Sequence, residues 1–295
     1  MSFRPENEAR DEAYARSPGR RLPAKAGLHA RFASRPGLVI LVCLLLVALM
    51  LGVSLLWRSY GDQAGGTSVF EDSVESGSEP VVHLTSGLGR VQVEGVEGLE
   101  NVEVSAERYA RGSNPSSAKE NADEVPVSVD NDGSAVEISF EGGRGTGADF
   151  HLKVPSGSAV EIESTAGDVE VSGLDNEVTV TADSGDVSVE DVRGSVTVEA
   201  PRGDVTVKRV STETEGAKLT VGSGDIELKD LVLGILEANV EAGNVTLSGR
   251  FSGSGKVSVE TGSINVKLPP EDNKNLDLQT RVGQITRDDE QGSGG

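Results

Sequence analysis

Four aspartates share one sequence context, in which a glycine precedes the acid and an alternating apolar pair follows it. They are Asp168, Asp186, Asp204 and Asp225. If the segments that carry them stack in register, their carboxylates lie about 4.8 Å apart along one edge. Carboxylates at that spacing repel one another, and Ca²⁺, which prefers oxygen ligands, would relieve the repulsion. We therefore predict a candidate calcium ladder at these residues; the alternative is that each Asp only closes its turn by bonding to nearby backbone.

The other chemistry-bearing residues form no catalytic pattern. His29, His83 and His151 are far apart in the sequence, and the chain has one cysteine to offer as a partner. The GSGK run at 253–256 lacks the first glycine and the final Ser or Thr of a phosphate-binding loop. We predict a protein that is not an enzyme and has no cofactor beyond the calcium considered above. Carboxylates are numerous enough for a glycosidase pair, so a polysaccharide-active enzyme stays open as an alternative.

The composition narrows the class of partner. The 295 residues include 48 Asp or Glu and 27 Lys or Arg, which gives a formal net charge of −21. Nucleic-acid binding needs clustered Lys and Arg against phosphate, so we predict no nucleic-acid partner. The single cysteine, Cys43, excludes an internal disulfide framework and a cysteine-based zinc site.

The four aspartates belong to a repeat that fills the second half of the chain. Each unit has an alternating strand, a turn that contains glycine, a second strand and another turn, as in VTVTADSGDVSVE at 178–190. Val, Ile and Thr in period-two alternation predict half-buried strands. Glycine permits a positive φ at the corner. The leading glycines are separated by 18, 18, 21, 19, 19 and 21 residues, and they are Gly167, Gly185, Gly203, Gly224, Gly243, Gly262 and Gly283.

Two folds satisfy this pattern. One is a meander of hairpins that forms a sandwich, and the other is a β-solenoid in which each repeat is one coil stacked on the last. The near-constant period and the recurrence of glycine at one phase favour the solenoid. We predict that the solenoid covers residues 80–287, with 81–160 as an irregular start that contains a loop at 111–124.

An uncharged apolar run of 21 residues, 37–57, precedes this domain. At about 1.5 Å per residue it spans roughly 30 Å, the thickness of a bilayer core, so it predicts one transmembrane helix. The first 36 residues hold eight Lys or Arg and four Asp or Glu, whereas the rest of the chain holds 19 and 44. The positive-inside rule therefore places the N-terminus in the cytoplasm and the C-terminal domain outside. A cleaved signal peptide is the alternative, although its apolar region is usually shorter.

Polar sequence surrounds the span and the repeat. Residues 1–36 contain four prolines and no sustained apolar period, which predicts a disordered cytoplasmic tail. Residues 58–79 are rich in Gly, Ser and acids, and we predict a flexible linker there. Residues 288–295 end in GSGG and are predicted to be a second disordered tail.

The repeats resemble a known family. The GDV strands, the segment LKVPSGSAVEIESTAGDVEV at 152–171 and the single N-terminal span are similar to those of the bacterial "putative adhesin" family of β-strand-repeat envelope proteins, over roughly residues 80–287. The resemblance implies a right-handed β-helix-like solenoid in an envelope protein, and it supplies no catalytic residues. The sequence departs from the repeat where aspartate is replaced by Asn244, Ser263 and Gln284.

Together these patterns predict an all-β, non-catalytic β-solenoid on a single N-terminal transmembrane helix at the cell membrane. We expect it to act as an adhesin-like binding or scaffolding surface for an unidentified protein or glycan, through outer strands rich in Thr, Ser, Glu and Lys. One alternative is an envelope-stress sensing or regulatory membrane protein that acts through a protein partner. Another is a scaffold that polymerises by stacking exposed coil ends.

Overall fold

The computed structural model describes residues 64–133, 135–269 and 275–289. The predicted cytoplasmic tail at 1–36, the predicted transmembrane helix at 37–57 and residues 290–295 of the predicted C-terminal tail lie outside this part of the chain. Within the described ranges, no helix has both the length and the apolar character needed to cross a membrane.

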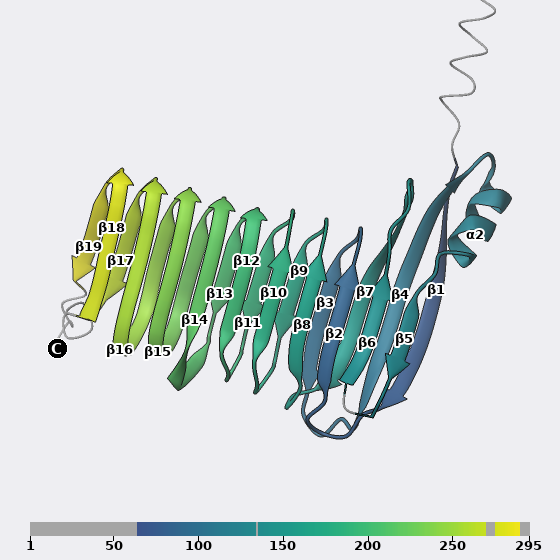
Figure 1. The fold of residues 1–295 in the computed structure, drawn as a ribbon, viewed down its shortest axis with the longest axis horizontal. Coiled ribbons are helices and arrows are strands. Elements are labelled where there is room, and N and C mark those ends of the chain that lie inside the picture. Colours follow the sequence, from purple (N-terminus) through teal and green to yellow (C-terminus); the bar gives the residue numbers. More distant parts are fainter. Residues whose placement is uncertain (1–63, 134, 270–274, 290–295) are drawn as a thin grey trace, which may run out of the picture. The chain divides into compact units, whose positions relative to one another are not determined.

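The described residues form a β-solenoid of about six turns together with one helix (Figure 1). Each coil gives one strand to a first side and one strand to a second side. The first side contains β6 (Ala135–Phe140), β2 (Val81–Ser86), β8 (Ala159–Ser164), β10 (Val178–Ala182), β12 (Val196–Arg202), the C-terminal parts of β14 (Ser211–Ser223), β15 (Ile226–Ala242) and β16 (Val245–Thr261), and β18 (Leu276–Val282).

The second side faces the first across the core, and from β9 onward it contains the strands that follow the leading glycines. It contains β7 (Thr146–Pro155), β3 (Val91–Val96), β9 (Val169–Ser172), β11 (Val187–Glu190), β13 (Val205–Lys208), the N-terminal parts of β15 and β16, β17 (Ile264–Leu268) and β19 (Ile285–Asp289).

Strand pairing follows the spacing of the repeats. Val187 pairs in parallel with Val205, 18 residues later, and Val205 pairs with Ile226, 21 residues later. The offsets between paired strands thus equal the separations between the leading glycines. Parallel pairing of successive repeats confirms the solenoid and excludes the hairpin sandwich.

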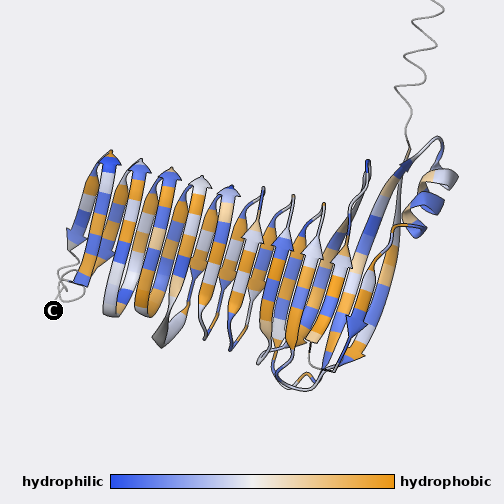
Figure 2. Cartoon of the chain, viewed as in Figure 1, coloured by the Kyte–Doolittle hydropathy of each residue, from blue (hydrophilic) through white to orange (hydrophobic). Residues whose placement is uncertain are grey.

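The core lies between the two sides and is built mainly from valine. Along β11, Val187 and Val189 are buried, whereas Ser188 and Glu190 are partly exposed, and the neighbouring coils repeat this alternation. Figure 2 shows the resulting stripes of apolar and polar residues across the strands. In the N-terminal coils, Phe140 and Phe150 extend the core, with ring centroids 6.3 Å apart.

Each leading glycine occupies a corner that no other residue fits. Gly203 has φ +138°, and a Cβ built on it would lie 1.9 Å from the carbonyl oxygen of Gly185 in the preceding coil. The predicted positive φ at this corner is therefore confirmed. Close stacking of the coils adds a second requirement for glycine, because there is no room for a side chain.

The N-terminal part of the domain has a different topology. Strand β1 (Ala64–Glu75) pairs antiparallel with β4 (Asn101–Gly112), which pairs antiparallel with β7. Strand β5 (Ser128–Asn131) pairs antiparallel with β6. Strands β2 and β3 then lie between the β6–β7 coil and the β8–β9 coil, so the chain does not build these first coils in sequence order.

The helix α2 (Pro115–Asp123) packs against β1 and β4 at this end. Its buried face consists of Ala118 and Ala122. Both Gly66 of β1 and Gly112 of β4 lie against Ala118, because a Cβ on either glycine would approach the Ala118 backbone to 2.3 Å. Asn114 caps the helix by accepting a hydrogen bond from the Ser117 N–H at 2.9 Å.

These observations correct three predicted boundaries. The linker predicted at 58–79 contains strand β1, whose twelve residues all pair with β4. The loop predicted at 111–124 contains helix α2. Strand β19 ends at Asp289, so the domain extends beyond the predicted boundary at 287. Strand β1 was missed because it alternates poorly, with Ser68 buried among Gly, Ser and acidic residues.

Candidate binding surface

The outer face of the second side is a broad polar sheet. Residues opposite one another on neighbouring strands point to the same face. One row crosses eleven strands and contains only polar residues: Glu71, Ser105, His151, Gln92, Glu170, Ser188, Thr206, Glu227, Thr246, Asn265 and Thr286. We call this face the second-side surface.

A shallow hollow of about 600 Å³ opens on this surface at its N-terminal end. Strands β1, β4 and β7 supply its lining, which consists of Glu71, Asp72, Ser73, Glu103, Val104, Ser105, His151 and Lys153. Glu71 and Glu103 share the outer face with Lys153, so carboxylates outnumber the lysine there and the hollow is acidic at neutral pH. It is therefore suited to a cationic group.

The hollow depends on antiparallel pairing between distant segments. Glu71 lies opposite Ser105, and Ser105 lies opposite His151. One row along, Ser73 lies opposite Glu103, and Glu103 lies opposite Lys153. Sequence reasoning missed the acids of β1 because it placed them in a linker; the signal that was available is the weak alternation of TSVFEDSV at 67–74.

The two histidines of the domain lie on opposite sides of the solenoid. His83, on β2 of the first side, places Nδ1 2.8 Å from Oε2 of Glu161. His151, on β7 of the second side, places Nε2 3.9 Å from Oε2 of Glu94. The structure therefore does not bring them together as an acid–base pair. The third histidine of the sequence, His29, lies outside the described residues.

The four predicted ladder aspartates do stack at one corner. The Oδ1 atom of Asp168 accepts the backbone N–H of Asp186 at 3.1 Å, and Asp186 likewise accepts that of Asp204 at 2.9 Å. Asp204 accepts the N–H of Asp225 at 2.8 Å. Each carboxylate thus satisfies an amide of the next coil, which is the turn-closing role extended between coils.

The ladder continues beyond the predicted residues. Asp225 accepts the N–H of Asn244 at 2.7 Å, and Asn244 Oδ1 accepts that of Ser263 at 3.0 Å. At the other end, Asp149 accepts the N–H of Arg90 at 2.8 Å. Because the amide of Asn244 performs the same task as a carboxylate, the negative charge is not what the corner requires.

The predicted calcium site would use the carboxylates of this ladder. Within the described ranges, no group of three or more His, Cys, Asp or Glu is placed to hold a metal ion. One oxygen of each predicted carboxylate is already engaged by backbone. Calcium binding at the ladder stays a prediction.

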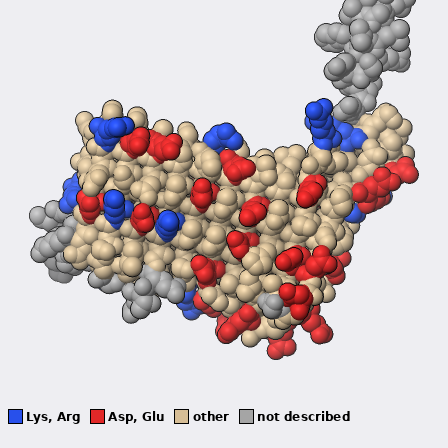
Figure 3. Space-filling view, in the orientation of Figure 1, with Lys and Arg blue, Asp and Glu red and all other residues tan. Residues whose placement is uncertain are grey.

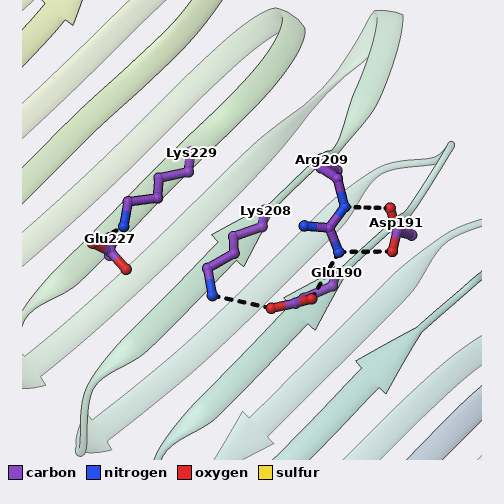
Figure 4. A network of polar contacts seen from close by, with 6 residues as sticks. All are labelled: Glu190, Asp191, Lys208, Arg209, Glu227 and Lys229. Atoms are coloured by element: carbon purple, nitrogen blue, oxygen red, sulfur yellow. Dashed lines mark hydrogen bonds and ion pairs between the residues drawn. The ribbon is translucent and has the colours of Figure 1, made fainter.

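A network of ion pairs crosses two coils of the second-side surface (Figure 4). The guanidinium of Arg209 bonds both oxygens of Asp191, at 2.6 and 2.8 Å, and Oε2 of Glu190 at 2.8 Å. Lys208 reaches Oε1 of Glu190 at 3.1 Å. These hydrogen bonds hold the pKa of Glu190 below its usual range, through Arg209 first and Lys208 second. The Arg209 hydrogen bond lowers the pKa of Asp191 and, in return, the pKa of Arg209 is raised.

The charge is distributed unevenly along the solenoid. Figure 3 shows that Asp and Glu gather over the N-terminal strands of the visible face. On the second-side surface, one row that enters the hollow contains, from its N-terminal end onward, Glu103, Lys153, Glu94, Ser172, Glu190, Lys208 and Lys229. A partner that recognises this surface would therefore meet an acidic end and a mixed end.

Comparisons with known proteins agree with this architecture. A model of the Toastrack DUF4097 family matches residues 88–293. The fold is similar to that of a "putative adhesin" from Bacteroides fragilis, with 16% identity, 75% of this chain and 97% of that chain covered, and a TM-score of 0.53. No curated protein matches the chain.

Two further solved structures are more distant. A "putative adhesin" from Parabacteroides merdae has 13% identity, with 76% of this chain and 96% of that chain covered and a TM-score of 0.42. A "putative cell adhesion protein" from Clostridium sporogenes has 11% identity, with 75% and 98% covered and a TM-score of 0.33. Identities this low establish similarity of fold alone.

Proposed function

This chain belongs to the Toastrack DUF4097 family, and we propose that it is a membrane-anchored, non-catalytic binding protein of the bacterial envelope that uses the second-side surface. The anchor is the apolar run at 37–57, and the excess of Lys and Arg before it supports a cytoplasmic N-terminus. The solenoid would then act outside the cytoplasm.

The observation that carries the proposal is the continuous second-side surface with its acidic hollow. Flat parallel sheets with a closed hydrophobic core expose a large, rigid array of side chains at low entropic cost, which suits recognition. The hollow marks one place on this surface where a partner could bind, and Glu71, Glu103 and Lys153 set the charges that the partner would meet there. The "putative adhesin" from B. fragilis, which shares the fold, is in keeping with such a role.

The absence of a catalytic arrangement in the described ranges is consistent with binding. His83 and His151 lie on opposite sides, and each contacts a single carboxylate through exposed side chains. The hollow contains neither a cysteine nor a serine paired with a histidine by a hydrogen bond of the described structure. We therefore propose recognition rather than turnover.

We favour a polypeptide partner over a glycan. Sugar sites commonly use aromatic platforms, and Phe140, Phe150 and Phe251 are buried in the core. Tyr109 of β4 lies against Gly147 of β7, where burial and then the charge of Asp149 raise the pKa of its hydroxyl. An acidic hollow without an open aromatic ring is better matched to Lys or Arg side chains of a protein.

The test is capture by the purified full chain in detergent, offered separately to the wall-glycan and membrane-protein fractions of the source cell. We expect a membrane protein to be retained and the glycan to pass. The variant Glu71→Lys/Glu103→Lys, which inverts the hollow, should reduce retention about tenfold or more. The matched control is Glu163→Lys/Glu199→Lys, which makes the same change of charge on the first side.

Equal loss of retention in both double variants would show that net charge, and not the hollow, governs capture. Retention of glycan with the membrane protein left behind would overturn the choice of partner. A reducing-sugar signal that grows with time during incubation with glycan would overturn the non-catalytic assignment.

A further inference from the structure

The two ends of the solenoid differ in what covers their terminal strands. At the N-terminal end, antiparallel strands β1 and β5 and helix α2 cover the coils. At the C-terminal end, β18 pairs only with β16 and β19 pairs only with β17 among the described residues. Val282 and Ile285, which flank the last glycine corner, have exposed fractions of 60% and 40%. An edge strand with exposed apolar residues is a template for pairing with another strand.

The backbone of β18 is arranged for such pairing. The carbonyl of Val282 accepts the N–H of Gly262 at 2.9 Å and so points to the preceding coil. Because backbone groups alternate in direction along a strand, the N–H and C=O groups of Asp277, Gln279 and Arg281 point to the free edge. The side chains of these three residues lie on the outer face and are exposed.

The same three residues form a self-complementary sequence. Asp277 and Arg281 flank Gln279 at equal distances along the strand. In an antiparallel pair centred on Gln279, Asp277 of each copy lies opposite Arg281 of the other. We propose that β18 is a homodimerisation edge, which pairs antiparallel with β18 of a second copy through Gln279.

The inner face of β18 agrees with this register. Leu276 would lie opposite Val282 of the second copy, and Leu278 opposite Thr280. Val282, now exposed, would thereby gain an apolar neighbour. Within one chain, Gln279 donates to Asp277 at 2.9 Å and Arg281 lies 3.7 Å from Glu260, so both charged groups are already held near the edge.

Strand β19 explains why the assembly stops at two copies. Its residue Arg287 is in register with the buried Val266 of β17, so it occupies an inward position. Arg287 instead reaches the carbonyl of Leu276 at 3.5 Å. A further complete coil would bury this charge, and inward charges are a known protection of sheet edges. Pairing of β18 with itself is isologous and therefore closed.

A disulfide on the two-fold axis tests the proposal. In an antiparallel pair, directly opposed hydrogen-bonded residues have Cα atoms about 5.5 Å apart, which a disulfide can bridge. The full chain in detergent would carry Cys43→Ser/Gln279→Cys and be treated with a mild oxidant. We expect a band of twice the monomer mass on a non-reducing gel. The control is Cys43→Ser/Thr220→Cys, which places the thiol on the same outer face of an interior coil.

Charge variants in the Gln279→Cys background test the register. Either Asp277→Arg or Arg281→Asp alone sets like charges opposite one another and should reduce the dimer band about tenfold. The double exchange Asp277→Arg/Arg281→Asp restores opposite charges and should recover most of it. Because one strand pair is a small interface, sedimentation of the unmodified chain over a concentration series should show a weak monomer–dimer equilibrium.

Several results would overturn the proposal. No dimer band at position 279, or an equal band at position 220, would reject the edge. A dimer band whose intensity is the same in both single charge variants as in their parent would reject the antiparallel register. Filaments, or pairing of β18 with a different protein while the chain itself stays monomeric, would reject the closed homodimer.

Discussion

The coils after Ala159 and the segment before them use the same residue types in two different ways. In the coils, each strand pairs with the strand one repeat away, so 18 to 21 residues of sequence separate partners. In the N-terminal segment, β1 pairs with β4 and helix α2 fills the space beside both. The coils therefore repeat one set of contacts between neighbours, whereas each contact of the N-terminal segment occurs once.

This difference teaches where each part is vulnerable. A coil is stabilised by its contacts with its two neighbours, so a defect at a stacked corner weakens two interfaces. The N-terminal segment ends the stack, and a defect there affects the cover rather than the coils. The following four changes test this contrast, from the largest expected effect to the smallest.

The largest effect is expected at a stacked corner. Gly203→Val introduces a side chain where φ is +138° and where the Gly185 carbonyl leaves no room. We expect a loss of more than about 3 kcal/mol in the free energy of unfolding, measured with urea. Gly65→Val is the control, because a Cβ on Gly65 meets nothing within 4 Å. Equal losses in the two variants would contradict the stacking argument.

A smaller and local effect is expected at the N-terminal cover. Gly66→Val forces apart β1 and α2, because its Cβ would approach the Ala118 backbone to 2.3 Å. We expect a loss of about 1–3 kcal/mol, with faster amide exchange in residues 115–123 and unchanged exchange in the coils. Faster exchange in β11 and β13 as well would show that cover and coils unfold as one unit.

The aspartate ladder should contribute about as much as one hydrogen bond. Asp204→Ala leaves the Asp225 N–H without its acceptor at 2.8 Å and should cost about 1 kcal/mol. Asp204→Asn should be nearly neutral, since Asn244 already plays this part for Ser263. A large loss in the Asn variant would mean that the negative charge itself is needed.

The variant Asp204→Asn also tests calcium binding at the ladder. If Ca²⁺ binds the ladder, millimolar Ca²⁺ should raise the melting temperature of the unmodified chain. The increase should vanish in Asp204→Asn, which keeps the hydrogen bond and removes a charge. An equal increase in both proteins would place the ion elsewhere, and no increase would end the calcium prediction.

The smallest effect is expected from the ion-pair network. The pKa values of Glu190 and Asp191 are lowered on folding by bonds to Arg209, so the network stabilises the fold above the ordinary carboxyl pKa of about 4. This stabilisation is lost as pH falls through the lowered values. Glu190→Gln should cost less than about 0.5 kcal/mol at pH 7, because these side chains are partly exposed, and the cost should shrink as pH falls through the lowered pKa of Glu190. Glu199→Gln serves as the control.

The sequence predicted the coils well because their signal is local and repeated. Leading glycines such as Gly185 and Gly203 mark both the corner and the register, and the alternation of Val187 and Val189 marks the buried face. The four ladder aspartates were also placed at one corner, although their partners turned out to be amides of the next coil.

Other features left little trace in the sequence. Asp191, Arg209 and Asp230 occupy the opposite corner with positive φ of 52–55°, a conformation for which glycine is the usual signal. The hollow required β1 and β7 to meet across β4, and no short-range pattern connects Glu71 with His151. Helix α2 was read as a loop because its only buried residues are two alanines.

Nearest-neighbour stacking has an evolutionary consequence. Because the corner at Gly185 meets only the corners at Gly167 and Gly203, a tandem duplication or loss of one 18-residue unit would preserve every contact type. Each such event changes the length of the domain by about 4.8 Å while leaving both termini of the stack as they are. Proteins built in this way can therefore change the length of the domain by whole coils while they keep the same fold.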